Sequence, residues 1–237
     1  MNLKYKILAV LAAGIALTAC GGSGTPASTP ASSAVPASSH VAEEGVTEPV
    51  NLLTWTLDDL DDPDTVTFIP ASITSGVKDG KLTAKVFDYD LYKKEDVEKL
   101  AVGDQITLHE EGAAWNQFVT VAVESIEKND QYHLVTINGG MEEQYGLDLL
   151  LEDDTYRTMT FDDYPVYYEM GEKTLPLEKN VVLKDSSAEP QAEAVETTGA
   201  DAVAAAINAA PDNWTTYNTT LGVQGGKVRE VRRIWVP

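Results

Sequence analysis

Cysteine is almost absent from this sequence, because Cys20 is the only one among 237 residues. A single cysteine cannot form an internal disulfide, so an apolar core has to hold the fold. The Cys20 thiol lies beside the N-terminal apolar run, and no other thiol is present for nucleophilic catalysis.

Basic residues are also scarce, with 17 Lys and Arg against 38 Asp and Glu and a net charge of −21. A chain this acidic is repelled by phosphate backbones and by anionic lipid head groups. The composition therefore predicts no nucleic acid partner, and it argues against attachment to a membrane by charge.

Long hydrophobic runs are limited to residues 7–17 at the N-terminus, where the apolar sequence is broken only by Gly14. A membrane-spanning helix needs about 20 apolar residues, so this run is too short to cross. Lys4 and Lys6 precede the run and small residues end it. This arrangement is typical of a secretory signal peptide.

The residues that end this run, Leu17-Thr18-Ala19-Cys20, resemble the lipobox of bacterial lipoproteins. The resemblance implies that the Cys20 thiol receives a diacylglyceryl group and that the signal peptide, 1–19, is cut before it. The protein would then be held by lipid on the extracytoplasmic face of the cell membrane or the outer membrane. Two or more acyl chains anchor a protein stably, whereas one does not. An ordinary signal peptide with a chance cysteine is the alternative.

The segment 20–49 is predicted to be a disordered tether. Gly, Ser, Thr, Pro and Ala fill 22 of the 29 positions after Cys20, and His40 lies among them. A flexible chain of this length spans roughly 30 Å. Removal of the signal peptide lowers the basic count to 15, so the mature charge would be about −23.

The remaining residues, 50–237, predict one mainly β domain, either a small barrel or a sandwich-like antiparallel sheet with one or two short helices. Polar residues at 186–199 predict a long surface loop, and the following 200–237 predict a helix and a hairpin. Two domains are the alternative, but so short a C-terminal piece would lack a core of its own.

Alternating apolar residues and turn signals place the expected strands. Pro70 predicts an edge position or a bulge, and turns are expected at Asp79-Gly80, Gly171 and Gly225-Gly226. Short helices are expected at 93–100 and 200–210. The expected strands are 50–57, 65–73, 81–89, 101–108, 117–127, 131–138, 155–161, 164–170 and 174–183.

The last expected strand is unusually basic for so acidic a chain, since it contains Lys227, Arg229, Arg232 and Arg233. We expect these side chains to pair with carboxylates of a neighbouring strand and to fix the C-terminal segment to the domain. A free basic tail that recruits a partner is the alternative.

Motifs of known enzymes are incomplete here. His109 begins a metalloprotease-like pattern, but Ala113 stands where the second histidine is required. In the expected meander, His109 and His133 lie roughly 25 Å apart and are ordinary strand residues. Gly226-Lys227 lacks the other residues of a phosphate-binding loop, and no Gly-x-Ser-x-Gly elbow is present. The chain is therefore not expected to be an enzyme.

Five carboxylates in seven positions make the acidic loop the main candidate for a metal site. Calcium binds six to eight oxygens, although the spacing does not match an EF-hand. A solvated turn with no bound metal is the main expectation and a weak calcium site the alternative. The residues are Asp58, Asp59, Asp61, Asp62 and Asp64.

Two further sets of side chains are candidate sites. Paired acids for a hydrolase could come from Glu110, Glu111, Glu142, Glu143, Asp162 and Asp163, which are expected to be exposed. A sugar-stacking platform could come from Tyr164, Tyr167, Tyr168, Trp115 and Trp214, for which core packing is the alternative.

The sequence thus predicts a lipid-anchored binding or envelope-associated module whose protein or glycan partner it does not identify, with no cofactor apart from the weak calcium alternative. The alternatives are an envelope hydrolase that uses paired carboxylates and a substrate-capture lipoprotein of a transporter. A deep pocket with buried carboxylates would favour the hydrolase, whereas a flat aromatic face would favour sugar or peptide binding.

Overall fold

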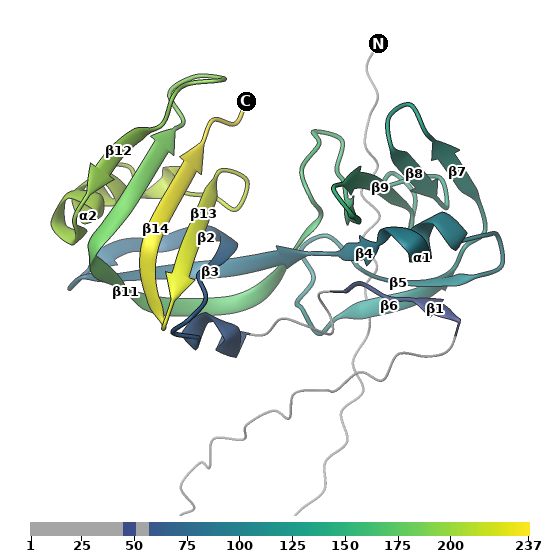
Figure 1. Cartoon of the computed structure of the whole chain (residues 1–237), viewed down its shortest axis with the longest axis horizontal. Coiled ribbons are helices and arrows are strands. Elements are labelled where there is room, and N and C mark those ends of the chain that lie inside the picture. Colours follow the sequence, from purple (N-terminus) through teal and green to yellow (C-terminus); the bar gives the residue numbers. More distant parts are fainter. Residues whose placement is uncertain (1–44, 51–56) are drawn as a thin grey trace, which may run out of the picture. The chain divides into compact units, whose positions relative to one another are not determined.

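The computed structural model describes residues 45–50 and 57–237, and it is mainly β, as predicted (Figure 1). The signal peptide, the lipobox with Cys20 and most of the tether lie outside the described residues. Within the described part of the chain, no helix is long and apolar enough to span a membrane. The elements are β1 (Val46–Thr47), η2 (Leu57–Asp61), β2 (Thr67–Lys78), β3 (Lys81–Tyr89), β4 (Leu91–Lys93), α1 (Lys94–Lys99), β5 (Gln105–His109), β6 (Phe118–Ala122), β7 (Ile126–Asn129), β8 (Leu134–Ile137), β9 (Leu147–Glu152), β10 (Thr155–Thr158), β11 (Tyr167–Ser186), β12 (Val195–Thr198), α2 (Ala200–Ala209), η3 (Pro211–Asn213), β13 (Thr219–Gln224) and β14 (Lys227–Ile234).

Five strands close into a barrel in the order β2, β3, β11, β14, β13 and back to β2. Strand β11 is long enough to close it, because residues 167–176 pair with β3 and residues 177–186 pair in parallel with β14. Strand β12 adds to the other side of β11. The barrel strands lie on the left in Figure 1.

The barrel strands, counted along the chain, follow the order 1-2-3-5-4 around the barrel, with strands 3 and 5 parallel. Helix α2 lies between the third and the fourth strand in sequence. This is the strand order of the OB-fold, a five-stranded Greek-key barrel. Such a fold supports many unrelated functions, so the function has to be argued from the side chains.

The chain leaves the barrel after β3 and returns at β11, and the intervening residues 90–166 form a second hydrophobic core. One sheet of this insertion has the order β4, β10, β9, β8, β7, and a smaller one has the order β1, β5, β6. Helix α1, which lies within the helix expected at 93–100, contributes Val97 to this core, and Leu100 directly after it is also buried there.

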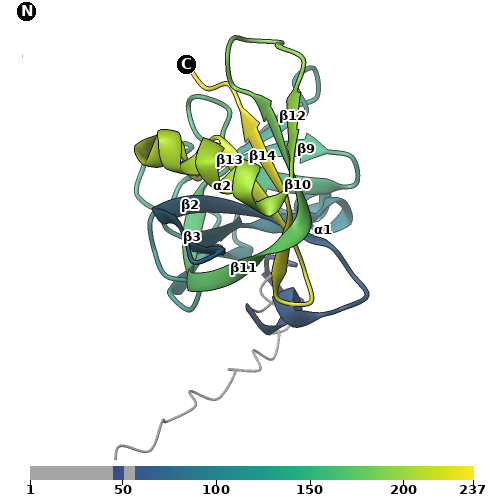
Figure 2. The ribbon, with the colours of Figure 1, turned by 90° about the vertical axis from the view of Figure 1, so that its left-hand side faces the viewer.

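Helix α2, which lies within the helix expected at 200–210, packs on the barrel through Val203 and Ile207. Figure 2 shows α2 above β2 and β3. The side-chain amide of Asn208 accepts a hydrogen bond from the Val77 N–H (2.8 Å) and donates one to the Val77 carbonyl (2.9 Å). Gly76, at φ +66°, leaves room for that amide.

Several expected local features are confirmed. Leu82, Ala84 and Val86 of β3 are buried on one face. The turn at Asp79-Gly80 has positive φ at both residues, as has the hairpin turn at Gly225-Gly226. Pro70 is the last residue of β2 that pairs with β13, and pairing with β3 begins at the next residue. Because proline has no backbone N–H to donate, this position costs the sheet few hydrogen bonds.

The structure also corrects several expectations. The expected strand 117–127 is two strands, β6 and β7, because residues 123–125 break it. The strands expected on either side of Gly171 are one strand, β11, and Gly171 forms an irregularity within it at φ +140°. Glycine suits a bulge here, because it adopts this backbone without a side-chain clash.

Two segments that the sequence assigned to irregular structure form strands. Residues 195–198 of the expected loop 186–199 pair with β11 as β12. Val46 and Thr47 of the expected tether pair in parallel with β5 as β1. Both strands add backbone hydrogen bonds at a sheet edge, which requires no apolar alternation in the sequence. Of the expected strand 50–57, residues 51–56 lie outside the described residues.

Candidate functional site

A groove of 570 Å³ lies between the barrel and the insertion, and we call it the Arg157 groove. The barrel provides aromatic side chains from β2, β3 and β11, whereas β9 and β10 of the insertion provide charged ones. Aromatic faces beside a few fixed polar groups are typical of ligand sites. Its main side chains are Phe68, Phe87, Asp88, Tyr89, Glu152, Arg157 and Tyr167.

Arg157 lines this groove although its side chain is only 8% exposed. Its Nε donates to Glu152 Oε1 (2.8 Å), one Nη donates to Asp163 Oδ1 (3.1 Å) and the other to the Thr158 carbonyl (3.3 Å). Burial lowers the pKa of Arg157, but the bonds and charges of Glu152 and Asp163 outweigh burial and raise it. The guanidinium is therefore a permanently charged and fixed set of donors.

Four tyrosines form a continuous row that begins in the Arg157 groove and leaves it, and we call them the tyrosine row. The ring centroids are 5.8 Å apart for Tyr89 and Tyr167, 5.7 Å for Tyr167 and Tyr217, and 5.3 Å for Tyr217 and Tyr164. All three pairs meet edge to face, a favourable geometry for aromatic rings. Burial raises the pKa of Tyr89 and of Tyr167, so both hydroxyls stay protonated.

The tyrosine row ends in a second, more apolar depression of 380 Å³, which we call the Phe161 hollow. Tyr164 and Tyr217 line it together with Met141, Val236 and Phe161, and the Phe161 side chain is 79% exposed. Large apolar side chains that remain exposed beside a depression are typical of an interaction site.

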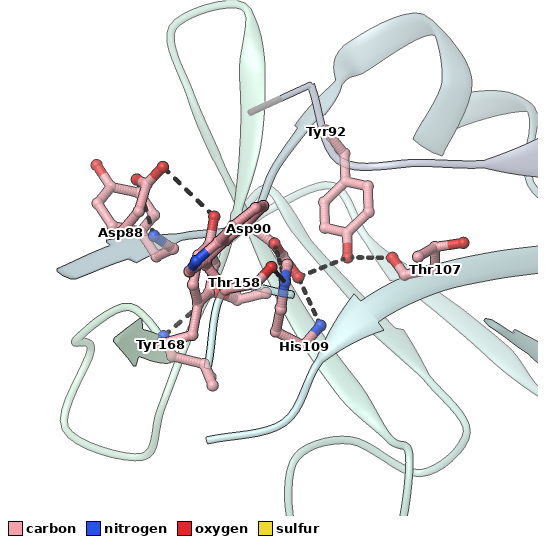
Figure 3. A network of polar contacts seen from close by, with 10 residues as sticks. Asp88, Asp90, Tyr92, Thr107, His109, Thr158 and Tyr168 are labelled. Carbon is pink, nitrogen blue, oxygen red and sulfur yellow. Dashed lines mark hydrogen bonds and ion pairs between the residues drawn. The ribbon is translucent and has the colours of Figure 1, made fainter. Parts of the chain in front are cut away.

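Of the ion pairs among the described residues, the most deeply buried is formed by Asp90 and His109, whose side chains are each 1% exposed (Figure 3). Asp90 Oδ1 accepts a hydrogen bond from His109 Nδ1 (2.8 Å), and Oδ2 accepts one from the His109 main-chain N–H (2.9 Å). The Tyr92 hydroxyl lies 3.4 Å from Oδ2 and donates to the Thr107 carbonyl. Both oxygens of this carboxylate are thus occupied.

Both ring nitrogens of His109 face acceptors, because Nε2 lies 2.7 Å from the Trp115 carbonyl. Two acceptors require two N–H donors, so the ring is an imidazolium. Burial lowers the pKa of His109, but the hydrogen bond and charge of Asp90, with the Trp115 carbonyl, raise it above its ordinary value. With no free ring nitrogen, His109 has a structural role rather than that of a general base.

Asp90 and His109 both belong to the insertion, and the His109 ring connects the pair to the barrel. The His109 ring, on β5, stacks on the ring of Tyr168 from β11 with centroids 3.9 Å apart. The main-chain N–H of Trp115 also donates to the Glu169 carbonyl of β11 (3.0 Å). A buried, fully bonded ion pair at such a junction favours one relative arrangement of the groups that it joins.

The five acids of the expected acidic loop are exposed, but Asp58, Asp59 and Asp61 lie within the short helix η2, and Asp62 and Asp64 follow it. The backbone of this segment binds the β13–β14 turn, because Gly225 N–H donates to the Asp62 carbonyl and Gly226 N–H donates to that of Leu60. The Asp64 N–H lowers the pKa of Asp62. Across the described residues, no group of three or more acidic, histidine or cysteine side chains is arranged to hold a metal ion.

The other predicted candidates are dispersed. The six clustered acids are exposed, as predicted, and of these Asp163 contributes to the Arg157 groove through its ion pair. His109 lies on a strand, but it is a buried ion-pair partner. His133 is not a strand residue, because it occupies the turn after β7 with φ +53°.

The basic strand β14 pairs with β11 in part as predicted. Arg229 contacts Glu178 (2.6 Å) and Arg233 contacts Asp185 (3.6 Å), and both carboxylates belong to β11. Arg232 was expected to do the same, but it pairs with Glu230 of its own strand. Its guanidinium lies over Phe68, which the strand order places near it. Lys227 is exposed at the start of β14.

The predicted aromatic platform is partly realised. Tyr164 and Tyr167 belong to the tyrosine row, whereas Tyr168 and Trp214 are buried and Trp115 lies outside both depressions. Sequence reasoning missed Tyr89, Tyr217 and Arg157. Their separation along the chain leaves no local signal, and only the cluster Tyr164-Pro-Val-Tyr167 indicated an aromatic surface.

No protein-family model, curated protein sequence or solved structure significantly matches this chain. The geometry of its own side chains is therefore the basis for a functional proposal.

Proposed function

We propose that this chain is a lipid-anchored, extracytoplasmic binding module that holds a neutral saccharide in the Arg157 groove. The observation that supports the proposal is the combination of the fixed Arg157 ion-pair network with the aromatic rings of Tyr89 and Tyr167 in one groove.

Saccharides present two kinds of surface, and the groove offers a partner for each. The C–H face of a sugar ring packs on an aromatic ring, which Tyr89 and Tyr167 provide. Hydroxyl groups require both donors and acceptors in fixed positions. The Glu152 carboxylate accepts, and its side chain is more than half exposed although Arg157 fixes it on one side. Hydrogen bonds to such ionised groups are the stronger kind.

Charge favours an uncharged ligand over an anionic one. The Arg157 cation is already paired with Glu152 and Asp163, and Asp88 adds a second carboxylate to the groove lining beside Glu152. An anion would therefore meet net negative charge here, as it would over the whole chain.

A hydrolase is less well supported than a binding module. The one deeply buried acid at this junction, Asp90, has both oxygens bonded to His109 and is 1% exposed. A ligand cannot reach it without breaking that pair. The depressions beside it are open and lined by aromatic rings, which favours binding.

The groove is tested with the full-length chain in detergent micelles, titrated calorimetrically with cellohexaose, maltohexaose, chitohexaose and xylohexaose. We expect at least one of these to bind. Tyr167→Ala should weaken that binding about tenfold, through loss of the stacking surface. Tyr132→Ala is the matched control, because Tyr132 is 63% exposed and lies in the turn between β7 and β8, outside the groove.

Aromatic grooves also bind proline-rich peptides, so a decaproline peptide is titrated in parallel. Binding of the peptide alone would overturn the saccharide proposal, as would saccharide binding that Tyr167→Ala leaves unchanged.

The anchor is tested separately, since Cys20 lies outside the described residues. Its support is the lipobox resemblance of Leu17-Thr18-Ala19-Cys20. In a bacterial host, we expect the wild type in the membrane fraction with labelled fatty acid attached. Cys20→Ala should lose the label. The variant should not be found in the membrane fraction in a form from which residues 1–19 have been removed. A labelled or normally processed membrane-bound variant would contradict the lipoprotein proposal.

A further inference from the structure

The Arg157 groove and the Phe161 hollow are joined by the tyrosine row. Tyr89 and Tyr167 line the groove, whereas Tyr164 and Tyr217 line the hollow. Tyr217 contacts both Tyr167 and Tyr164, so no gap separates the aromatic rings of the two depressions. Tyr217 itself is 41% exposed, which leaves part of its ring accessible between them.

The two depressions differ in chemistry. The groove has a guanidinium and two carboxylates, Asp88 and Glu152, among its lining side chains. The hollow is lined mainly by apolar and aromatic groups, with Glu111 and Asp162 as its acids. The groove is therefore suited to orient hydroxyl groups, and the hollow to cover the C–H faces of rings.

We propose that the two depressions are subsites of one extended site, and that the ligand is an uncharged oligosaccharide chain rather than a single sugar. This inference rests on the proposed function, because it assigns a chain of sugar rings to the groove and its continuation. One end of the chain binds the groove, its middle lies on Tyr217 and its other end lies against Phe161 and Tyr164.

The side chains of the hollow come from both the barrel and the insertion, which supports an extended ligand. Tyr217 belongs to the barrel, whereas Tyr164 and Phe161 belong to the insertion. The backbone holds the Tyr164 segment, because the Thr160 N–H donates to the Tyr164 carbonyl (2.6 Å) and the Asp163 N–H donates to the Thr160 carbonyl (3.0 Å). The Asp163 carboxylate of this same segment bonds to Arg157 of the groove. The hollow is thus tied to the groove, as subsites for one ligand require.

The charge of the two subsites again favours an uncharged oligosaccharide over an anionic one. Each subsite contains carboxylates, so a polyanionic chain would be repelled along its whole length. A chain without charge meets the same aromatic surface without that repulsion.

The test is a chain-length series on the full-length protein in detergent, with cello-, malto-, chito- and xylo-oligosaccharides of two to six units. For a series that binds, we expect affinity to rise at least tenfold from the dimer to the hexamer. Phe161→Ser should weaken the hexamer about tenfold and change the dimer less than twofold. Tyr167→Ala should weaken both. Tyr132→Ala, outside both subsites, should weaken neither.

The outcomes separate this inference from the proposed function. A dimer and a hexamer of equal affinity, or a hexamer that Phe161→Ser leaves unaffected, would overturn the extended site and leave groove binding intact. Failure of every saccharide to bind would overturn both. Because the Phe161 side chain is 79% exposed, its replacement should not disturb folding, and an unchanged melting temperature verifies this.

Discussion

The buried ion pair of Asp90 and His109 shows how much depends on single residues in this chain. Its members are separated by 18 residues in the sequence, yet His109 donates two hydrogen bonds to Asp90 in the interior. Removal of one partner leaves the other charge buried and unpaired, which in buried pairs costs about 3–5 kcal/mol. The pair also contributes the stacked contact with Tyr168, so its loss would affect both the insertion and the barrel.

The raised pKa of His109 makes stability depend on pH in a defined direction. Its stabilising contribution should be complete below the unfolded-state value of about 6.5 and should disappear as pH rises through the higher folded-state value. We therefore expect the wild type to lose melting temperature relative to His109→Gln as pH rises above about 6.5.

His133→Gln is the matched control for this pH series. His133 is exposed in a turn, so its removal should leave the wild-type profile unchanged. A constant difference between the wild type and His109→Gln across that range would contradict the proposed imidazolium.

At the scale of elements, the contact of α2 with β2 depends on one side chain. Asn208 satisfies both backbone groups of Val77. This contact requires Gly76, because a Cβ there would collide with Asn208 Oδ1. The conformational freedom of one glycine thus allows the helix to pack on the barrel strand.

Gly76→Ala should therefore destabilise the fold more than Gly80→Ala. Both glycines have similar positive φ, +66° and +70°, so the backbone strain of about 1–2 kcal/mol is common to both variants. A Cβ on Gly80 meets no atom within 4 Å, whereas one on Gly76 displaces Asn208. We expect about 1–3 kcal/mol of additional loss, from the unsatisfied Val77 groups.

Urea unfolding of both variants measures this difference. Asn208→Ala should remove most of the additional sensitivity, since it removes the atom that collides. Equal losses for the two glycine variants would contradict the assigned role of Gly76.

Individual strands and helices were predictable where apolar residues recur at the spacing of a strand or a helix. Strand β3 and helix α2 show the spacing of their buried residues directly. Strand β11 was predicted as two strands because Gly171 resembles a turn, whereas Gly171 occupies a bulge within one strand. Local signals cannot distinguish a bulge from a turn, since the partner strand decides between them.

The candidate site was less predictable than the elements. Tyr167 and Tyr164 were foreseen as aromatic surface, but the sequence does not show that Tyr89 and Tyr217 join them. Asp90 gave no signal at all, because its partner His109 belongs to another strand. Contacts of this kind follow from barrel closure, which no local pattern encodes.

For the whole molecule, the net charge of −21 implies self-repulsion in the folded state. The ion pairs that offset it on the surface contribute little each. Raising NaCl from about 10 mM to about 150 mM shortens the screening length from about 30 Å to about 8 Å. We expect the melting temperature to rise by about 2–4 °C over this range, which corresponds to about 1 kcal/mol.

Differential scanning calorimetry in NaCl and in KCl measures this effect, and the two salts should agree because screening is not specific to the ion. A melting temperature that falls with salt would show that attractive pairs, such as Arg229 with Glu178, outweigh the repulsion.

The insertion between β3 and β11 has a consequence for the rate at which the chain folds. The barrel closes only when these two strands pair, although residues 90–166 separate them. Pairing of β4 with β10 brings Leu91 beside Arg157 and so draws together the two ends of that long segment. An insertion that folds first would lower the entropic cost of closing the barrel by roughly 2 kcal/mol. We therefore expect substitutions in the core of the insertion to lower the folding rate of the barrel, although they change no contact within the barrel itself.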